Sequence, residues 1–406
     1  MNKKEVKKAP ALRFKGFTND WEQRKLKKLG FFYKGKGYTK KDLINNGVPI
    51  LLYGELYTHY SEKISNTRLH SKLFLHSIFS AGNEVVLPDS GETSTDIARA
   101  SWISNSGIIL AGGLIIIKPN EYIFPGFLAY SLTYGKNHKL LASRAQGKSI
   151  VHIHANDLKT LNIIYPENLK EQQRIFALLE KLNKCIALQQ RKLKLLRTLK
   201  SGLSFKLFNK KHLNNLSQIS LDQIGQTYSG LTGKSKKDFG HGHAFYVSYL
   251  NVNQNEIGNP KQIDRIEIDK KQNLVQKNDI FFTISSETPE EVGLTSLWPV
   301  SCKNLYLNSF CFGFRINTKM FIPLYLGYLF RSEYFREKVL PLAQGISRYN
   351  LSKNNVLKIK IGQEEIAIQE KYAKVMNDLD SDILRQKKKV KELKLCKKFL
   401  LQNMFI

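Results

Sequence analysis

The chain has 406 residues, and at about 150 residues per domain this length predicts two to three domains. Lysine and arginine total 64 against 34 acidic residues, so the net charge of +30 indicates a polyanionic partner, with nucleic acid first and an anionic membrane surface second. The longest apolar run, Ile108–Ile117, is far shorter than the roughly 20 residues of a membrane span, and the basic N-terminus lacks an apolar signal core. We therefore expect no membrane insertion and a cytoplasmic protein, whose four scattered cysteines are reduced thiols.

The charge is concentrated in two segments. Residues 1–41 carry 14 basic and 3 acidic side chains, and Lys181–Lys211 contains no acidic residue at all. Residues 42–166, in contrast, have a net charge of only +1. A run of like charge is either a solvated surface or a site for a polyanion, so charge alone leaves both interpretations open.

The body of each half is predicted to be mixed. Short β-branched and aromatic runs bounded by Gly, Asn and Asp predict strands, and a proline near the first turn opens a helix that follows them. In the first half the strands are predicted at Val48–Tyr53, Glu84–Leu87 and Gly113–Ile117, and the helix at Pro125–Ser143. In the second half they are predicted at Phe245–Tyr249, Asp279–Thr283 and Phe310–Ile316, and the helix at Pro323–Leu340.

A long helix is predicted at the end of each half. Apolar residues across 175–207 recur at alternating steps of four and three, which is a heptad seam. Adding 197 to each number gives a second seam, whose polar interruptions coincide with those of the first: Gln189 with Gln386, and Lys200 with Lys397. We expect the two helices to pair, with the glutamines fixing the register, although each helix could instead pack only on its own domain. The predicted pairing residues are Leu182, Ile186, Gln189, Leu193, Leu196, Leu379, Ile383, Gln386, Val390 and Leu393.

These matches belong to an internal repeat about half the chain long. Ala145-Gln146-Gly147 recurs as Ala343-Gln344-Gly345, and Lys41-Asp42 recurs as Lys237-Asp238, at offsets of 198 and 196. Shared order and near-constant spacing indicate a duplication. The predicted fold class is α+β: two mixed α/β domains separated by two long helices that pair as an antiparallel coiled coil, with a pseudo-two-fold repeat. The predicted segments are a tail (1–20), a first domain (21–167), a first helix (168–211), a second domain (212–362) and a second helix (363–406).

No catalytic constellation is visible in the sequence. The run Gly230–Ser235 imitates the end of a phosphate-binding loop, but the required leading glycine is replaced by Tyr228. No Asn/Asp-Pro-Pro-Tyr/Phe run of an amino-methyltransferase is present, and the close histidine pairs at 152/154 and 241/243 lack neighbouring ligands. We therefore predict no catalytic residue and no metal site, which favours a binding and scaffolding protein.

The N-terminal residues resemble those of a known family. Pro10–Phe17, followed by Asp20–Leu26, is similar to the entry of the first target-recognition domain in type I restriction-modification specificity (S) subunits. Gln172–Ile175 resembles the start of the first spacer helix of that family, and the duplicated plan covers nearly the whole chain. The second half departs from the pattern, because Gln363–Gln369 is a weaker helix entry and no tryptophan lies near Leu221.

The resemblance implies a non-catalytic subunit of a restriction endonuclease and adenine methyltransferase complex. The two mixed domains would be target-recognition domains, each reading one half of a bipartite, asymmetric site in double-stranded DNA. The helices would set the unread spacer and dock two methyltransferase subunits, and two motor-nuclease subunits would complete the complex. S-adenosylmethionine, ATP and magnesium are then expected on the partner subunits, with no cofactor on this chain.

Candidate DNA contacts are polar or basic residues on glycine-containing loops, which allow the backbone to approach phosphates closely. The Ala-Gln-Gly loop is the strongest candidate because it recurs, although a plain turn explains it equally well. Glu92 and Glu287 could accept a hydrogen bond from cytosine, but we expect them to cap helices. The predicted DNA-binding residues are Lys34, Lys36, Tyr38, Thr39, Lys40, Ser90, Thr93, Ser94, Gln146, Gly147, Lys148, Ser149, Tyr228, Thr232, Lys234, Ser285, Thr288, Gln344, Gly345, Ser347, Arg348 and Tyr349.

Two alternatives remain at this stage. A coiled-coil scaffold with two protein-binding heads would show no salt-dependent DNA binding, and a fused restriction-methylation enzyme would need the methyltransferase motif that is absent. The spacer role makes a specific prediction. One helical turn is about 5.4 Å, or about 1.5 base pairs, so one turn inserted before Leu193 should lengthen the recognised spacer by one or two pairs.

Overall fold

The computed structural model describes residues 9–147 and 149–405. The described chain divides into two compact units. Unit 1 contains the residues up to Gln190 together with those from Lys388, and unit 2 runs from Arg191 to Lys387. Each unit therefore combines one mixed domain with parts of both long helices, whereas the predicted segments assigned each helix to one half.

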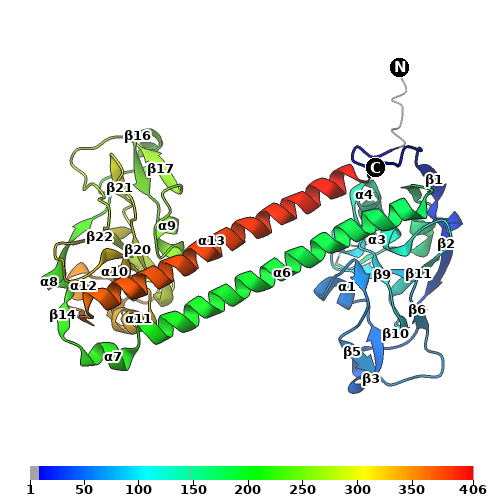
Figure 1. Cartoon of the computed structure of the whole chain (residues 1–406), viewed down its shortest axis with the longest axis horizontal. Helices are drawn as coiled ribbons and strands as arrows, with labels where there is room; N and C mark the ends of the chain where they lie inside the picture. Colours follow the sequence, from blue (N-terminus) through cyan, green and yellow to red (C-terminus); the bar gives the residue numbers. More distant parts are fainter. Residues whose placement is uncertain (1–8, 148, 406) are drawn as a thin grey trace. The chain divides into compact units, whose positions relative to one another are not determined.

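Unit 1 is built on a five-stranded sheet in the order β2-β11-β7-β9-β4 and a four-stranded sheet in the order β5-β3-β10-β6 (Figure 1). The ribbons β1-β13 and β12-β8 complete it. The strands are β1 Glu22–Lys25, β2 Gly30–Lys34, β3 Leu43–Leu51, β4 Lys63–Ile64, β5 Leu69–Ser71, β6 Phe79–Ala81, β7 Glu84–Pro88, β8 Ser90–Gly91, β9 Ser101–Ile103, β10 Ser106–Leu110, β11 Leu114–Pro119, β12 Val151–His152 and β13 Asn162–Tyr165. The helices are η1 Leu26–Lys28, η2 Lys40–Asp42, α1 Glu55–Thr58, α2 Ser94–Ile97, α3 Pro125–Thr133, α4 Gly135–Arg144, α5 Ala155–Lys159 and the first part of α6 Leu169–Leu207.

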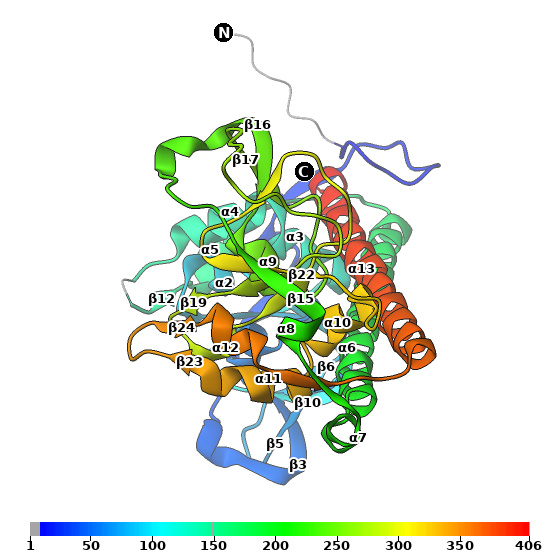
Figure 2. The ribbon, with the colours of Figure 1, turned by 90° about the vertical axis from the view of Figure 1, so that its left-hand side faces the viewer.

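Unit 2 repeats this plan with a four-stranded sheet, β15-β22-β18-β20, and a second sheet, β17-β16-β21 (Figure 2). Its smaller sheets are β14-β25 and β19-β24-β23. The strands are β14 Gln218–Ser220, β15 Gly225–Ser229, β16 Phe239–Val247, β17 Ile263–Ile266, β18 Ile280–Thr283, β19 Ser285–Ser286, β20 Thr295–Leu297, β21 Leu305–Leu307, β22 Cys311–Ile316, β23 Ala343–Gln344, β24 Tyr349–Leu351 and β25 Lys360–Gly362. The helices are α7 Lys210–Asn215, α8 Leu221–Ile224, η3 Lys236–Asp238, α9 Tyr249–Gln254, η4 Pro289–Glu291, α10 Pro323–Leu329, α11 Glu333–Val339, η5 Leu340–Leu342, α12 Lys353–Leu357 and α13 Ile366–Asn403, which ends in unit 1.

The long helices follow the predicted seam. Ile186, Ile383, Gln386 and Val390 are buried, and the other predicted pairing positions are half-buried, while most residues between them are exposed. In unit 1 the beginning of α6 and the end of α13 share one hydrophobic core, and in unit 2 the end of α6 shares a core with the beginning of α13. Each unit thus places the helices antiparallel, and the α+β fold class is confirmed.

A buried glutamine near the start of each long helix ties it to the preceding domain. The side chain of Gln172 accepts a hydrogen bond from the amide of Phe124 (2.7 Å) and donates to the carbonyl of Tyr122 (2.9 Å). Gln369 does the same with the amide of Ile322 (2.8 Å) and the carbonyl of Met320 (3.0 Å). Both glutamines are fully buried, so their amide groups depend on these partners, and the apparently weaker second helix entry makes the same contacts as the first.

Two expectations about local structure were wrong. The predicted helix Pro125–Ser143 is two helices, α3 and α4, because the chain turns at Gly135 with φ +73°. The counterpart helix is likewise divided into α10 and α11.

The predicted N-terminal tail is attached to unit 1 at Leu12 and Arg13. Leu12 donates its amide hydrogen to the carbonyl of Asn403 (2.8 Å), and Arg13 forms an ion pair with Glu171 (2.7 Å). Trp21, one residue after the predicted tail, is buried against Phe127, with 5.7 Å between ring centroids. Phe14 of this segment packs against the core of unit 1, so the segment is part of the fold.

Candidate nucleic-acid interface

Two of the predicted contact loops meet in unit 1. Strand β8 pairs with β12, so that Ser90 lies opposite His152. Gln146 forms a bridge with the same histidine, with backbone hydrogen bonds of 2.8 and 3.1 Å. The segments around Ser90 and Gln146, far apart in the sequence, therefore form one ribbon on which Gln146 and Ser149 are exposed. Lys148 lies outside the described residues.

Unit 2 contains the equivalent ribbon. Ser285 of β19 lies opposite Asn350 of β24, and Gln344 of β23 lies opposite the same asparagine. At its tip Ser347 and Arg348 are exposed, whereas Tyr349 is half-buried. The repeat thus places polar side chains at the same position of both domains.

The recurring glycine is required by the turn in each ribbon. Gly147 has φ +136° and Gly345 has φ +141°, in a region that other residues rarely adopt. A Cβ atom on Gly147 would lie 1.8 Å from the carbonyl oxygen of Ile150, and one on Gly345 would lie 2.0 Å from that of Arg348. The Ala-Gln-Gly repeat is therefore explained by backbone geometry, and its neighbours are free to face solvent.

The short helices η2 and η3 occupy equivalent positions in the two units, and each begins with the same kind of N-terminal cap. Thr39 caps η2 through a capping box with Asp42, and Ser235 caps η3 with Asp238. Lys36 and Lys40 are exposed, and neither has an ion pair with another described residue. Lys34 is exposed too, with a loose contact of 3.6 Å to Asp89.

Lys236 and Lys237 of η3 lie in Tyr228–Lys237, the segment predicted from the sequence as the counterpart of Lys34–Lys41. Both are exposed, and they occupy the positions equivalent to Lys40 and Lys41. The recurrence of Lys-Lys-Asp at an offset of 196 is the sequence signal that indicates this equivalence.

Three predicted contact residues are used by the fold instead. The ring of Tyr38 is buried and stacks on Phe74 at 4.7 Å, and its hydroxyl hydrogen-bonds with that of Ser77 (2.5 Å). Tyr228 donates its hydroxyl hydrogen to Asp279 (2.7 Å). Lys234 is paired with Asp269 (2.8 Å), and hydrogen bonding by this lysine is the main reason that the pKa of Asp269 is lowered to about 2.

The remaining predicted residues divide into capping and solvent-facing positions. Thr93 is the N-cap of α2 and accepts a hydrogen bond from the amide of Asp96 (3.1 Å), so the expectation that Glu92 caps this helix was wrong. Glu287 is not a cap either, because Thr288 occupies the N-cap position of η4. Both glutamates, together with Thr232 and Thr288, are exposed, and Ser94 is half-buried.

The two lysines that interrupt the seam join the long helices to the domains. In unit 1 Lys397 of α13 lies 2.8 Å from the carboxylate of Glu62, which also accepts hydrogen bonds from Tyr134 (2.5 Å) and Asn183 (3.1 Å). Asn183 belongs to α6, so one buried carboxylate contacts both long helices. The sequence identified Lys397 as an interruption but not its partners, since Glu62 is 335 residues away.

Unit 2 has an equivalent cluster, in which the lysine belongs to α6 instead of α13. Lys200 of α6 lies 2.5 Å from Glu256 of the domain and 2.6 Å from Asp380 of α13. Tyr328 donates to the other oxygen of Asp380 (3.0 Å), and its ring lies 5.4 Å from the lysine nitrogen. Each domain is therefore held on both helices by one lysine, carboxylate and tyrosine cluster.

The described residues contain no group of three or more His, Cys, Asp or Glu side chains arranged to hold a metal ion. Both ring nitrogens of His241 lie within hydrogen-bonding distance of a partner, Nδ1 with the carboxylate of Glu267 (3.1 Å) and Nε2 with the carbonyl oxygen of Lys237 (2.8 Å). Within the same residues, no helix combines the length and the apolar character needed to cross a membrane.

One protein family and two solved structures are similar to this chain. Residues 18–198 match the family described as the type I restriction modification DNA specificity domain. The S subunit of the type I restriction-modification system of M. genitalium aligns with a TM-score of 0.63 at 17% identity, over 98% of this chain and 99% of that one. A second chain, from a structure describing complex assembly and conformational transition of the type I R-M system, has a TM-score of 0.53 at 14% identity over 98% and 99%. No curated protein sequence matches significantly.

Residues 18–198 are thus similar to the type I restriction modification DNA specificity domain family, and the whole chain has a fold similar to that of the solved M. genitalium S subunit.

Proposed function

We propose that this chain is the DNA specificity subunit of a type I restriction-modification complex, and that each mixed domain reads one half of a bipartite, asymmetric site. The observation that carries the proposal is the duplicated ribbon. Each unit exposes polar side chains on a glycine-dependent turn, at Gln146 and Ser149 in one and at Gln344, Ser347 and Arg348 in the other. Because these side chains differ between the units, the two half-sites should differ as well.

The physical roles follow from the side-chain chemistry. Gln and Arg form paired hydrogen bonds with adenine and guanine edges, while Ser, Thr and Lys hold phosphates and so fix the position of the domain. One small domain discriminates by about 1–3 kcal/mol per mismatched base pair. Two domains on one scaffold act at high effective concentration, so their specificities combine.

We further propose that the long helices set the spacer between the half-sites and dock two methyltransferase subunits, with two motor-nuclease subunits completing the complex. The solved chain described in the context of type I complex assembly supports this expectation. S-adenosylmethionine, ATP and magnesium would then be bound by those partner subunits.

Methylome sequencing tests the proposal directly. A host expressing this chain with its cognate methyltransferase subunit should acquire one bipartite motif methylated on adenine. Changing Gln344→Ala with Arg348→Ala should alter one half of the motif, and Gln146→Ala with Ser149→Ala only the other half. An assembled complex that methylates no such motif would favour a protein-binding scaffold instead.

A further inference from the structure

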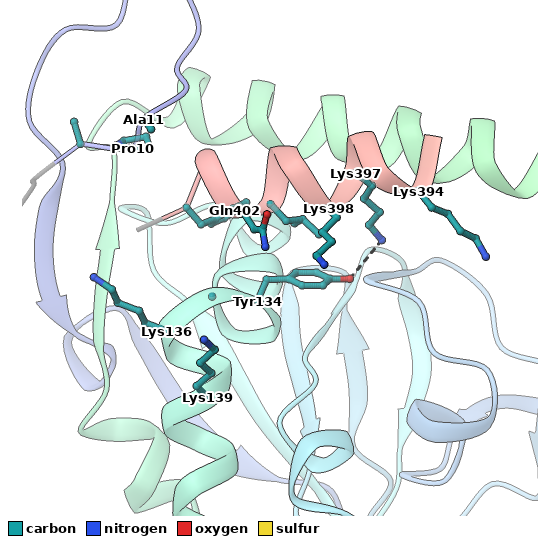
Figure 3. Close-up of a pocket in the computed structure, with 13 residues that line it drawn as sticks. Pro10, Ala11, Tyr134, Lys136, Lys139, Lys394, Lys397, Lys398 and Gln402 are labelled. Atoms are coloured by element: carbon teal, nitrogen blue, oxygen red, sulfur yellow. Dashed lines mark hydrogen bonds between the residues drawn. The ribbon is translucent and has the colours of Figure 1, made fainter. Parts of the chain in front are cut away.

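Unit 1 contains a pocket of about 730 Å³ between α4, the C-terminal part of α13 and the N-terminal segment (Figure 3). Pro10, Ala11, Leu401 and Phe405 give it an apolar lining. Lys398 and Gln402 extend from α13 toward α4, and the ring of Tyr134 lies beneath them (Figure 3). The pocket is thus an apolar hollow with a polar rim.

Among the described residues, the charged side chains that line this pocket are all lysines: Lys136 and Lys139 on α4, and Lys394, Lys397 and Lys398 on α13. Lys397 is neutralised by Glu62. The other four have no ion pair with any described residue, and all four are exposed. Four like charges around one hollow repel each other, and an anionic group placed there would relieve this repulsion.

The equivalent helix of unit 2 has a glutamate at the position of Lys139. At the repeat offset, Glu333 and Glu337 of α11 replace Gly135 and Lys139 of α4. Glu337 is paired with Lys210, the first residue of α7. The same helix position therefore carries either sign of charge, and among the described residues only the glutamate of unit 2 has a counter-charge.

The shape of the pocket favours a polypeptide over a nucleic acid. Duplex DNA presents a convex, polar backbone, whereas this hollow has an apolar lining that would accept one buried side chain. The ribbon proposed to contact DNA follows the C-terminal end of α4, and the pocket lies at its N-terminal end. The 10 residues of α4 separate the two by about 15 Å.

We propose that this pocket binds an acidic polypeptide segment that inserts one large apolar side chain between Phe405 and Pro10. Carboxylates flanking that side chain would pair with Lys136, Lys139 and Lys398. The inference rests on the proposed function only in expecting that the segment belongs to a subunit of the same complex.

A defined probe tests the pocket on the full-length chain. The probe is a short fluorescein-labelled peptide of aspartate and glutamate around a central Leu-Trp, and its binding is measured by fluorescence anisotropy. Charge reversal by Lys136→Glu with Lys398→Glu should weaken binding roughly tenfold or more. The matched control is Lys389→Glu with Lys391→Glu, which changes the charge equally at exposed positions of α13 outside the pocket and should leave binding unchanged.

One further peptide and one further variant separate the apolar contribution to binding from the electrostatic contribution. A peptide with Ser-Ser in place of Leu-Trp should bind more weakly, because the apolar anchor is lost. Neutralisation by Lys136→Gln with Lys398→Gln should give intermediate binding, and equal thermal midpoints would show that the variants are folded.

Failure of the peptide to bind, or equal losses in the pocket and control variants, would overturn the proposal. It would also be overturned if the pocket variants lost affinity for a short mixed-sequence DNA duplex but not for the peptide, since the pocket would then be part of the DNA contact. None of these outcomes depends on the methylated motif, so this proposal and the proposed function can fail separately.

Discussion

A lysine inside an apolar heptad seam destabilises helix packing unless a partner neutralises it. Lys397 meets this requirement through Glu62, whose side chain is only 8% exposed. Burial by itself raises the pKa of the Glu62 carboxyl, but the charge of Lys397 and the hydrogen bonds from Lys397 and Tyr134 lower the pKa overall. The pair therefore stabilises unit 1 above the ordinary carboxyl pKa of 4.5, and this contribution is lost as pH falls through the lowered value.

Replacing Lys397→Met should lower the free energy of unfolding of unit 1 by about 3 kcal/mol, because Glu62 would stay buried without a counter-charge. The loss can be measured by thermal unfolding at neutral pH, with the exposed Lys398→Met as the control. The difference between wild type and variant should shrink in acid, as pH falls from 4.5 through the lowered pKa of Glu62, because a protonated Glu62 needs no counter-charge. Equal stabilities at neutral pH, or a difference that grows in acid, would contradict this account.

The importance of the two turn glycines, Gly147 and Gly345, can be tested by substitution. Gly147→Ala or Gly345→Ala should cost about 1–3 kcal/mol locally and weaken DNA binding, because each Cβ would collide with a backbone carbonyl. Gly202→Ala is the control, since it lies in α6 with nothing within 4 Å of its Cβ position and should stabilise the helix by about 1 kcal/mol. Filter binding gives the DNA affinity, and thermal unfolding gives the stability, of the two turn variants and of the control. Normal DNA affinity in Gly147→Ala and Gly345→Ala would exclude the ribbons as contacts.

At the scale of the element, α6 carries a charge pattern that its packing does not require. Arg191, Lys192, Lys194 and Arg197 are exposed and have no ion pairs with described residues, and no acidic residue lies between Lys181 and Lys211. Such a face would either lie along the unread central DNA or meet acidic surfaces of partner subunits. Electrostatic binding to DNA differs from protein docking in its dependence on salt, so the two roles are separable.

Changing these four residues to glutamine should flatten the dependence of log K on log salt by about 3.6 if all four contact phosphates of B-form DNA. Assembly with the methyltransferase subunit, followed by size-exclusion chromatography, should then be unchanged. An unaltered salt slope combined with lost assembly would assign this face of α6 to protein contacts.

For the whole molecule, the two long helices are the feature proposed to determine the spacer. A seven-residue insertion keeps the heptad phase, whereas a four-residue insertion shifts the seam. Adding seven residues both between Gln189 and Leu193 and between Gln386 and Val390 should lengthen the spacer by about three base pairs, at 1.5 Å per residue and 3.4 Å per pair. Methylome sequencing should show the original half-sites at the new separation. Intact half-sites with the old spacer would rule out a measuring role for the helices.

Much of the architecture could be predicted from the sequence because it depends on periodicity and repetition. The heptad spacing of residues 175–207, repeated 197 residues later, predicts two long helices, and α6 and α13 confirm them. The recurrence of Ala-Gln-Gly likewise identified equivalent turns, since only glycine tolerates φ near +140° there. The family resemblance, given by Pro10–Leu26 together with the repeat, is confirmed by the match over residues 18–198.

Tertiary structure alone decided which polar side chains face solvent and which are used by the fold. Tyr38, Tyr228 and Lys234 were predicted to contact DNA from the composition of their segments, yet each contacts a partner that sequence spacing does not indicate. The partner of Lys397 is equally hidden, because a domain loop and a distant helix meet only after folding. The sequence by itself determined the repeat, the long helices and the family resemblance, since these follow from local patterns. Exposure and pairing required the structure, because they depend on contacts between residues far apart in the chain.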